Sequence, residues 1–303
     1  MLLSLFLGLL AASSPVQLPA TSELQLEFVL TSGGPRYYRT FVPAGADLED
    51  ELPMIVCYHG GLGNALQIAN SNGVLEEARR RGWIAVFPEG TSLLDDGARV
   101  GLPPFKLQVW NAGSCCGLAT TQDIDDVDFF ERMLSKLDAQ HPLDENRVFV
   151  TGMSNGAMMS YRIASERPDL VAGIAPVAGS LVMDPPTLPV PILAIHGLLD
   201  ENVPFQGGVG SGFSKYEFIS QADSFLPFLE LGGLGGPAQV TTGSNFLFLQ
   251  WSGKPSGAPS AYFLALDGGH TWPGASPSLL QPLEPVHTDV PATALMFAFF
   301  AGL

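Results

Sequence analysis

The feature that most constrains this chain is a G-x-S-x-G motif at residues 152–156. A short apolar, β-branched run from Arg147 leads into it, and helix-forming residues follow it. Strand, motif and helix in that order are typical of a nucleophile elbow, a sharp turn that lifts the serine hydroxyl to the top of a sheet. Glycine is needed beside the serine because a Cβ there would collide with neighbouring backbone. The sequence therefore predicts that Ser154 is a nucleophile at the edge of a sheet.

Short apolar runs alternate with segments of helical spacing along most of the chain. This alternation predicts an α/β fold with a doubly wound, mostly parallel sheet and helices on both faces. Besides the strand that leads into the motif, we expect strands at residues 24–30 and 36–42 (a hairpin), 52–58, 83–87, 171–178, 190–195, 240–251 and 261–266. We expect helices at residues 64–81, 123–137, 214–229 and 292–300. Residues 88–120 have no period, which favours a long binding or lid loop.

Composition bounds the class of protein and its partners. The 303 residues are 46% hydrophobic and 15% charged, as in a globular protein with a large core. A net charge of −16 repels phosphate backbones and anionic lipids, so we expect no nucleic-acid partner and no stable membrane association. No metal-ligand spacing is visible, and we expect no metal or organic cofactor. No linker or repeat divides residues 21–303, so we expect one domain and a monomer.

The N-terminus predicts a targeting segment. Residues 1–12 are apolar or small without interruption, a stretch too short to span a bilayer. They match the apolar core of a secretory signal, with small residues at 11–13 as a cleavage site, although no basic residue precedes Arg36. We assign residues 1–20 to a signal peptide and expect an extracellular or periplasmic protein. The alternative is a buried or disordered N-terminal segment.

A serine hydroxyl is a poor nucleophile until a base removes its proton. In doubly wound hydrolases the serine is followed along the chain by an acid and then a histidine, each at the carboxyl end of a strand. Among the five histidines, His270 comes directly after the expected strand 261–266. His287 follows a proline-rich stretch with no strand before it, so we predict His270 as the base.

The acid that fits this order is Asp200, which follows the expected strand 190–195. It would hold the imidazole in the correct tautomer and stabilise the imidazolium. The alternative for Asp200 is a turn or helix cap, a common use of aspartate. Asp223 falls inside an expected helix, and Asp267 lies so close to His270 that we expect it to shape the turn.

An oxyanion hole needs two N–H donors aimed at the developing negative charge. Asn155 supplies one at the start of the helix after the serine. The second donor comes from the loop after the third strand, here the glycine-rich residues 59–63. Gly61 is our first choice and Leu62 the second, and the alternative for this loop is a plain turn.

Aromatic and acidic residues near these loops have two interpretations each. Trp110, Trp272 and His59 are candidates for substrate contact, and the alternative for the tryptophans is ordinary core packing. Asp125 and Asp126 stand at a helix start, where the helix dipole accounts for both without a catalytic role.

The three cysteines do not form a disulfide framework. Cys57 lies in an apolar strand and is expected to be a small core residue. Cys115 and Cys116 are adjacent, with Cα atoms about 3.8 Å apart across a trans peptide. That is below the usual disulfide range of about 4.4–6.8 Å, so a bond between them would be strained. A vicinal disulfide and two free thiols remain alternatives.

Several motifs together resemble the secreted poly(3-hydroxybutyrate) depolymerase-like esterases, a group close to feruloyl and acetylxylan esterases. The motifs are His59-Gly-Gly-x-Gly-Asn-Ala65, Trp110 with Cys115-Cys-Gly117, Asp125-Asp-Val127, Thr151-Gly-Met-Ser-Asn-Gly-Ala157, His196-Gly-x-x-Asp200 and Gly268-Gly-His-Thr-Trp-Pro-Gly274. The resemblance implies an α/β-hydrolase fold and a triad of Ser154, Asp200 and His270. A cysteine common in such proteins is missing from residues 180–184, which leaves the partner of Cys115 or Cys116 open.

These observations predict a secreted serine ester hydrolase that acts on polyhydroxyalkanoate polyester or its oligomers through an acyl-enzyme. The alternative substrate is a feruloyl or acetyl ester of the plant cell wall. We see no linker to a separate substrate-binding domain, which such polymer-degrading enzymes often carry. A non-catalytic binding module and a serine peptidase on the same scaffold are the remaining alternatives.

Overall fold

The computed structural model describes residues 23–44, 51–92, 107–211, 215–233, 236–254, 257–275 and 284–303. The expected signal peptide, residues 1–20, lies outside these ranges, so it remains a prediction. In the described part of the chain, no helix is long and apolar enough to cross a membrane.

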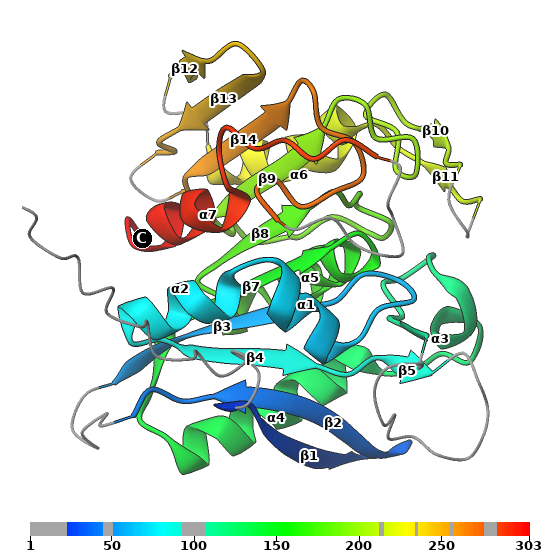
Figure 1. Ribbon diagram of the computed structural model, residues 1–303, viewed down its shortest axis with the longest axis vertical. Coiled ribbons are helices and arrows are strands. Elements are labelled where there is room, and N and C mark those ends of the chain that lie inside the picture. The colour runs from blue at the N-terminus through cyan, green and yellow to red at the C-terminus, as the bar shows by residue number, and fades with distance from the viewer. Residues whose placement is uncertain are drawn as a thin grey trace, which may run out of the picture.

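A ten-stranded sheet forms the centre of the molecule (Figure 1), in the order β1-β2-β4-β3-β7-β8-β9-β14-β13-β12. Its six central strands are parallel: β4 (Ile84–Pro88), β3 (Leu52–Tyr58), β7 (Leu143–Met153), β8 (Gly173–Val177), β9 (Ile192–Gly197) and β14 (Ser260–Ala265). Antiparallel hairpins form both edges: β1 (Gln25–Thr31) with β2 (Gly34–Phe41), and β12 (Gln239–Thr242) with β13 (Phe246–Trp251). The mostly parallel α/β architecture predicted from the alternating pattern is confirmed.

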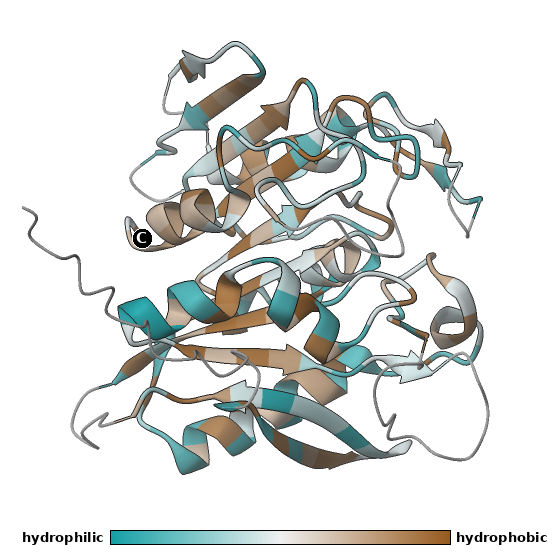
Figure 2. Cartoon of the chain, in the orientation of Figure 1, coloured by the Kyte–Doolittle hydropathy of each residue, from teal (hydrophilic) through white to brown (hydrophobic). Residues whose placement is uncertain are grey.

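Helices cover both faces of the sheet. The helices α1 (Ala65–Ser71), α2 (Val74–Arg81) and α7 (Ala292–Phe300) bury apolar side chains against one face. The helices α4 (Asp126–Gln140), α5 (Asn155–Glu166) and α6 (Gln221–Gly232) do the same on the other face. Figure 2 shows strongly apolar central strands between the helices; α2 carries polar residues on its outer side, whereas α7 is mostly apolar. Because each parallel strand is covered on both faces, its residues read as a continuous apolar run.

Small elements connect this framework at the carboxyl ends of the strands. They are β5 (Thr91–Ser92) paired with β6 (Gln108–Val109), α3 (Gly117–Thr121), and β10 (Gly208–Val209) paired with β11 (Glu217–Phe218). The 3₁₀ turn Pro168–Leu170 instead follows α5 and leads into the amino end of β8. Residues 88–120 therefore contain short strands and a helix, and residues 93–106 of the expected lid loop lie outside the described ranges.

Three element boundaries differ from expectation, each for a local reason. The helix expected at 64–81 is two helices, because Gly73 has φ of 77° and Asn72 turns its amide inward to the Cys57 sulfur at 3.2 Å. The helix expected from residue 214 begins only at Gln221, where the Ser220 side chain caps it. The strand expected at 240–251 is the β12–β13 hairpin.

Candidate active site

Ser154 lies in the sharp turn between β7 and α5, with φ of 56° and ψ of −119°. This turn needs its two glycines, since a Cβ on Gly152 would collide with the Gly156 carbonyl and a Cβ on Gly156 with the Tyr58 carbonyl. The Ser154 N–H donates to the Val177 carbonyl at 2.9 Å, which fixes the turn to the end of β8. This backbone conformation is rare for a residue other than glycine, and the hydrogen bond to Val177 helps to hold it.

The structure brings Ser154, His270 and Asp200 together in one hydrogen-bonded chain. The Ser154 Oγ lies 2.8 Å from His270 Nε2, and His270 Nδ1 lies 2.7 Å from Asp200 Oδ2. The other Asp200 oxygen accepts the backbone N–H groups of Asn202 and Val203 at 2.9 and 2.7 Å. With Nδ1 donating to the carboxylate, Nε2 is free to accept the serine proton. The three residues come from the ends of β7, β9 and β14.

Charges around His270 favour its protonated form. Burial works against the imidazolium, but the charge of Asp200, its hydrogen bond and the charge of Glu284 outweigh burial and raise the pKa of His270. A raised pKa makes the imidazole a stronger base.

The other described histidines near the strand ends have partners of their own. His287 is buried, with Nδ1 2.6 Å from Asp267 Oδ1 and Nε2 accepting the Val290 N–H. Asp267, which we expected to shape the turn before His270, is therefore the partner of His287. His196 Nε2 lies 2.9 Å from the Val203 carbonyl, and burial lowers the pKa of His196.

The hydrogen bonds of Gly61 and Leu62 distinguish these two candidates for the second oxyanion donor. The Leu62 N–H donates to the Gln108 carbonyl at 2.8 Å, so Leu62 is not available as a donor. The Gly61 N–H has no acceptor among the described residues, and a Cβ on Gly61 would lie 3.7 Å from Asn155 Cβ. Asn155 occupies the first position of α5, where an N–H has no acceptor within the helix. The geometry thus leaves Asn155 and Gly61 as a neighbouring donor pair.

The three residues predicted to contact substrate are all buried, and the packing alternative describes them better. Trp110 donates its Nε1–H to the His59 carbonyl at 2.9 Å, and Trp272 donates to Thr293 Oγ1 at 3.0 Å. The His59 ring accepts the Gly90 N–H at 3.1 Å, and burial lowers the pKa of His59 to about 4. These buried side chains fix the loops that carry them through hydrogen bonds to neighbouring segments.

Asn155 and Trp110 are joined in a way that the sequence did not signal. The Asn155 side chain accepts the Trp110 N–H at 2.7 Å and donates to the Trp110 carbonyl at 3.1 Å. The loop after β6 is therefore fixed to the residue that follows Ser154.

A buried ion pair supports the same loop. Asp126 lies 2.6 Å from Arg36 and accepts the Asn111 N–H at 2.8 Å. Asp125 and Asp126 stand at the start of α4 as expected: the Asp125 side chain caps the helix, and Asp126 is fully buried in its first turn. Both acids thus lie where the helix dipole favours them, and Asp126 has in addition an ion pair with Arg36 from a distant strand.

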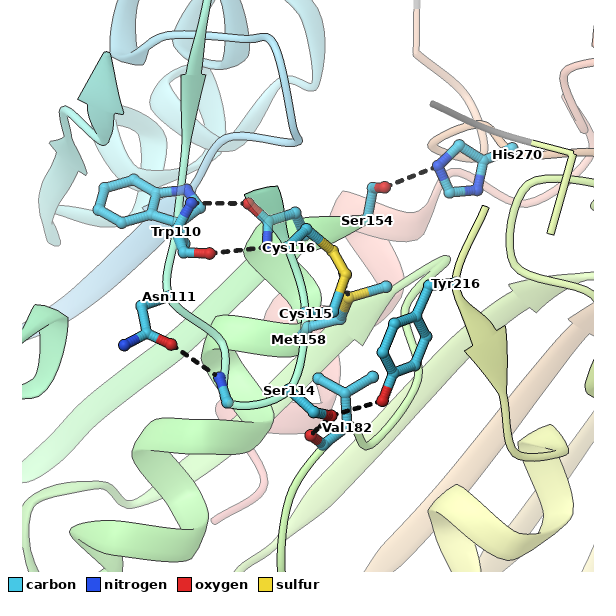
Figure 3. Close-up of a disulfide and its surroundings, with 12 residues drawn as sticks. Trp110, Asn111, Ser114, Cys115, Cys116, Ser154, Met158, Val182, Tyr216 and His270 are labelled. Atoms are coloured by element: carbon cyan, nitrogen blue, oxygen red, sulfur yellow. Dashed lines mark hydrogen bonds between the residues drawn. A yellow bond between two sulfur atoms is a disulfide. The ribbon is translucent and has the colours of Figure 1, made fainter. Parts of the chain in front are cut away.

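Cys115 and Cys116 form a disulfide, while Cys57 is a free, buried core residue as predicted. The disulfide belongs to a small apolar cluster apart from the two main cores, which we call the disulfide cluster: Ala112, Cys115, Met158, Val182, Val203 and Phe218, with Cys116 and Tyr216 at its partly exposed edge. Cys116 Sγ lies 4.0 Å from Met158 Sδ, one turn of α5 beyond Ser154 (Figure 3). The described residues contain no group of three acidic, histidine or cysteine side chains placed to hold a metal.

Residues 36–185 match the family described as esterase PHB depolymerase. The match covers 150 of the 303 residues, just under half of the chain, and the chain resembles this esterase family over that part. It is a carboxylic ester hydrolase with an α/β-hydrolase fold.

Individual relatives agree with the family assignment. NocK from Nocardia uniformis subsp. tsuyamanensis, which is named as an esterase, is 29% identical over 82% of this chain and 74% of its own. Feruloyl esterase B from Piromyces equi is 27% identical over 67% of this chain, and this match spans only 37% of that longer protein. The solved acetyl xylan esterase from Aspergillus awamori shares the fold, with a TM-score of 0.58 over 92% of this chain and all of that one, at 15% identity.

Proposed function

We propose that this esterase is a secreted serine hydrolase in which Ser154, His270 and Asp200 form the catalytic triad. The observation that carries the proposal is the hydrogen-bonded chain from Ser154 Oγ through His270 to Asp200, with distances of 2.8 and 2.7 Å. Secretion is supported by the apolar N-terminal segment at residues 1–12.

The reaction proceeds through an acyl-enzyme. Ser154 Oγ attacks the ester carbonyl while His270 Nε2 takes its proton. The N–H groups of Asn155 and Gly61 donate to the oxyanion of the tetrahedral intermediate. His270 then gives the proton to the leaving alcohol, and a water molecule, activated by the same imidazole, releases the acid. Asp200 keeps Nδ1–H in place and stabilises the imidazolium.

The proposed substrate is a polyester of hydroxyalkanoic acids or its oligomers. Two observations support it: the family description, and the uncharged disulfide cluster one helical turn from Ser154. An aliphatic ester chain carries no charge, so an apolar surface suits it better than ionised side chains would.

An ester of the plant cell wall is the second candidate. It is favoured by the match to a relative named feruloyl esterase B over two thirds of this chain. A substrate panel separates the two: polyhydroxybutyrate film and hydroxybutyrate oligomers against methyl ferulate and acetylated xylan. The polyester proposal fails if only the latter pair is hydrolysed.

Ser154→Ala tests the triad itself. We expect hydrolysis of a short p-nitrophenyl ester to fall by at least about 10⁴-fold, because no other group replaces the nucleophile. Ser165→Ala removes a hydroxyl from the same helix and should leave the rate unchanged. Near wild-type activity in Ser154→Ala would overturn the mechanism.

A further inference from the structure

The segment Glu284–Pro285 lies across the loops that carry His270 and Asp200. The Glu284 carboxylate accepts the His270 backbone N–H with one oxygen and the Asn202 side-chain amide with the other. The Pro285 carbonyl accepts the Gly269 N–H at 2.8 Å and the Thr271 hydroxyl at 3.1 Å. Four hydrogen bonds therefore fasten this segment, three of them to the loop around His270.

The contact between Glu284 and Asn202 connects Glu284 to Asp200. The backbone N–H of Asn202 donates to Asp200 Oδ1 at 2.9 Å, while its side chain donates to Glu284. A single carboxylate thus links the residue that cradles Asp200 to the residue that is the proposed base. Loss of this link would let the two loops move independently, and a shift of about 1 Å in a catalytic group can cost about 10²-fold in rate.

Glu284 also adds a charge close to His270. The titratable groups that interact electrostatically with His270 are Asp200, Glu284 and His196. The charges of Asp200 and Glu284 act against burial and raise the pKa of His270, whereas burial lowers the pKa of His196. Burial, together with the charges of Asp200 and Glu201, raises the pKa of Glu284 itself, and the hydrogen bond from His270 opposes this.

We propose that Glu284 is a positioning residue that ties the loop of the base to the loop of the acid and holds a carboxylate beside His270. This inference rests on the proposed Ser154–His270–Asp200 mechanism. Glu284 does not touch Ser154 in the described contacts, so its effect on the reaction passes through His270 and Asn202.

The test is the pH profile of kcat/KM for a short p-nitrophenyl ester in Glu284→Gln and Glu284→Ala. Activity is lost as pH falls and His270 becomes protonated. Removing the negative charge lowers the pKa of His270, so the acid limb should move to lower pH by about 0.5–1 unit in both variants. Glu284→Gln keeps an oxygen for the His270 N–H, and the Asn202 amide can rotate to accept from the new amide. Its plateau rate should therefore exceed that of Glu284→Ala.

Glu201→Gln is the matched control, because it removes one exposed negative charge beside Asp200 without breaking the Glu284 contacts. Its acid limb should move less than that of Glu284→Gln. An unchanged acid limb in Glu284→Gln, with Ser154→Ala inactive, overturns the role of Glu284 and leaves the proposed mechanism standing. If Glu284→Ala does not fold, the near-isosteric Glu284→Gln decides alone.

Discussion

The two sides of Ser154 differ in chemistry. On the His270 side lie carboxylates and an amide, all held by hydrogen bonds: Asp200, Glu284 and Asn202. On the other side lies the disulfide cluster, which is sulfur-rich and uncharged. Proton transfer is favoured by charges held in fixed positions. An uncharged ester chain binds best to an apolar surface, because contact removes apolar area of both from water. The difference suggests that one side determines the rate and the other the fit of the substrate.

Asp200→Asn should have the largest effect and should act on the rate alone. The amide cannot stabilise the imidazolium and holds the imidazole in the wrong tautomer, so we expect kcat to fall by about 10⁴-fold with KM nearly unchanged. Steady-state kinetics on a p-nitrophenyl ester measures this. A rise in KM with kcat preserved would remove the distinction between the two sides.

Met158→Ala is the corresponding change on the apolar side. Met158 is buried in the disulfide cluster, so its loss should lower the free energy of unfolding by about 2–5 kcal/mol and raise KM more than it lowers kcat. Met159→Ala is the matched control, because Met159 is the next residue on α5 and packs in the main core. Its loss should lower stability without changing KM. Urea unfolding and kinetics on esters of increasing acyl length measure both effects. Equal KM changes in the two variants would argue against a substrate-facing role for the cluster.

Tyr216→Phe should have the smallest effect. The Tyr216 hydroxyl lies 2.5 Å from Ser114 Oγ, at the partly exposed edge of the disulfide cluster. Its removal should cost about 1 kcal/mol of stability and change KM by only a few fold. A double-mutant cycle with Ser114→Ala isolates this contact, since each single variant removes the same hydrogen bond. A loss of kcat beyond tenfold in Tyr216→Phe would place the tyrosine among the reacting groups.

The sequence predicted the strands and helices of the α/β fold well, because the strands of a parallel sheet are recognisable from their local sequence. Buried strands read as apolar runs, and the placement of Asp200 and His270 follows from where those runs end. Glu284 left no such signal, since its partner Asn202 lies 82 positions earlier in the sequence.

Burial of polar and aromatic residues was harder to read. Trp110 and His59 were named as candidates for substrate contact, but both are buried and are held by contacts with Asn155 and Gly90 on distant elements. The pairing of Asp126 with Arg36 likewise depends on tertiary packing, which helix propensity does not report.

The parallel register between β9 and β14 limits which insertions this site can tolerate. β9 and β14 pair with Gly197 opposite Ala265, and His270 and Asp200 follow a few residues beyond those positions. A slip of one residue between the two strands would move one loop by about 3.3 Å relative to the other. The 2.7 Å contact between His270 and Asp200 could not survive such a slip. Insertions within β9 or β14 should therefore abolish activity even where the protein still folds, whereas the outer hairpin β12–β13 leaves room for loop grafting.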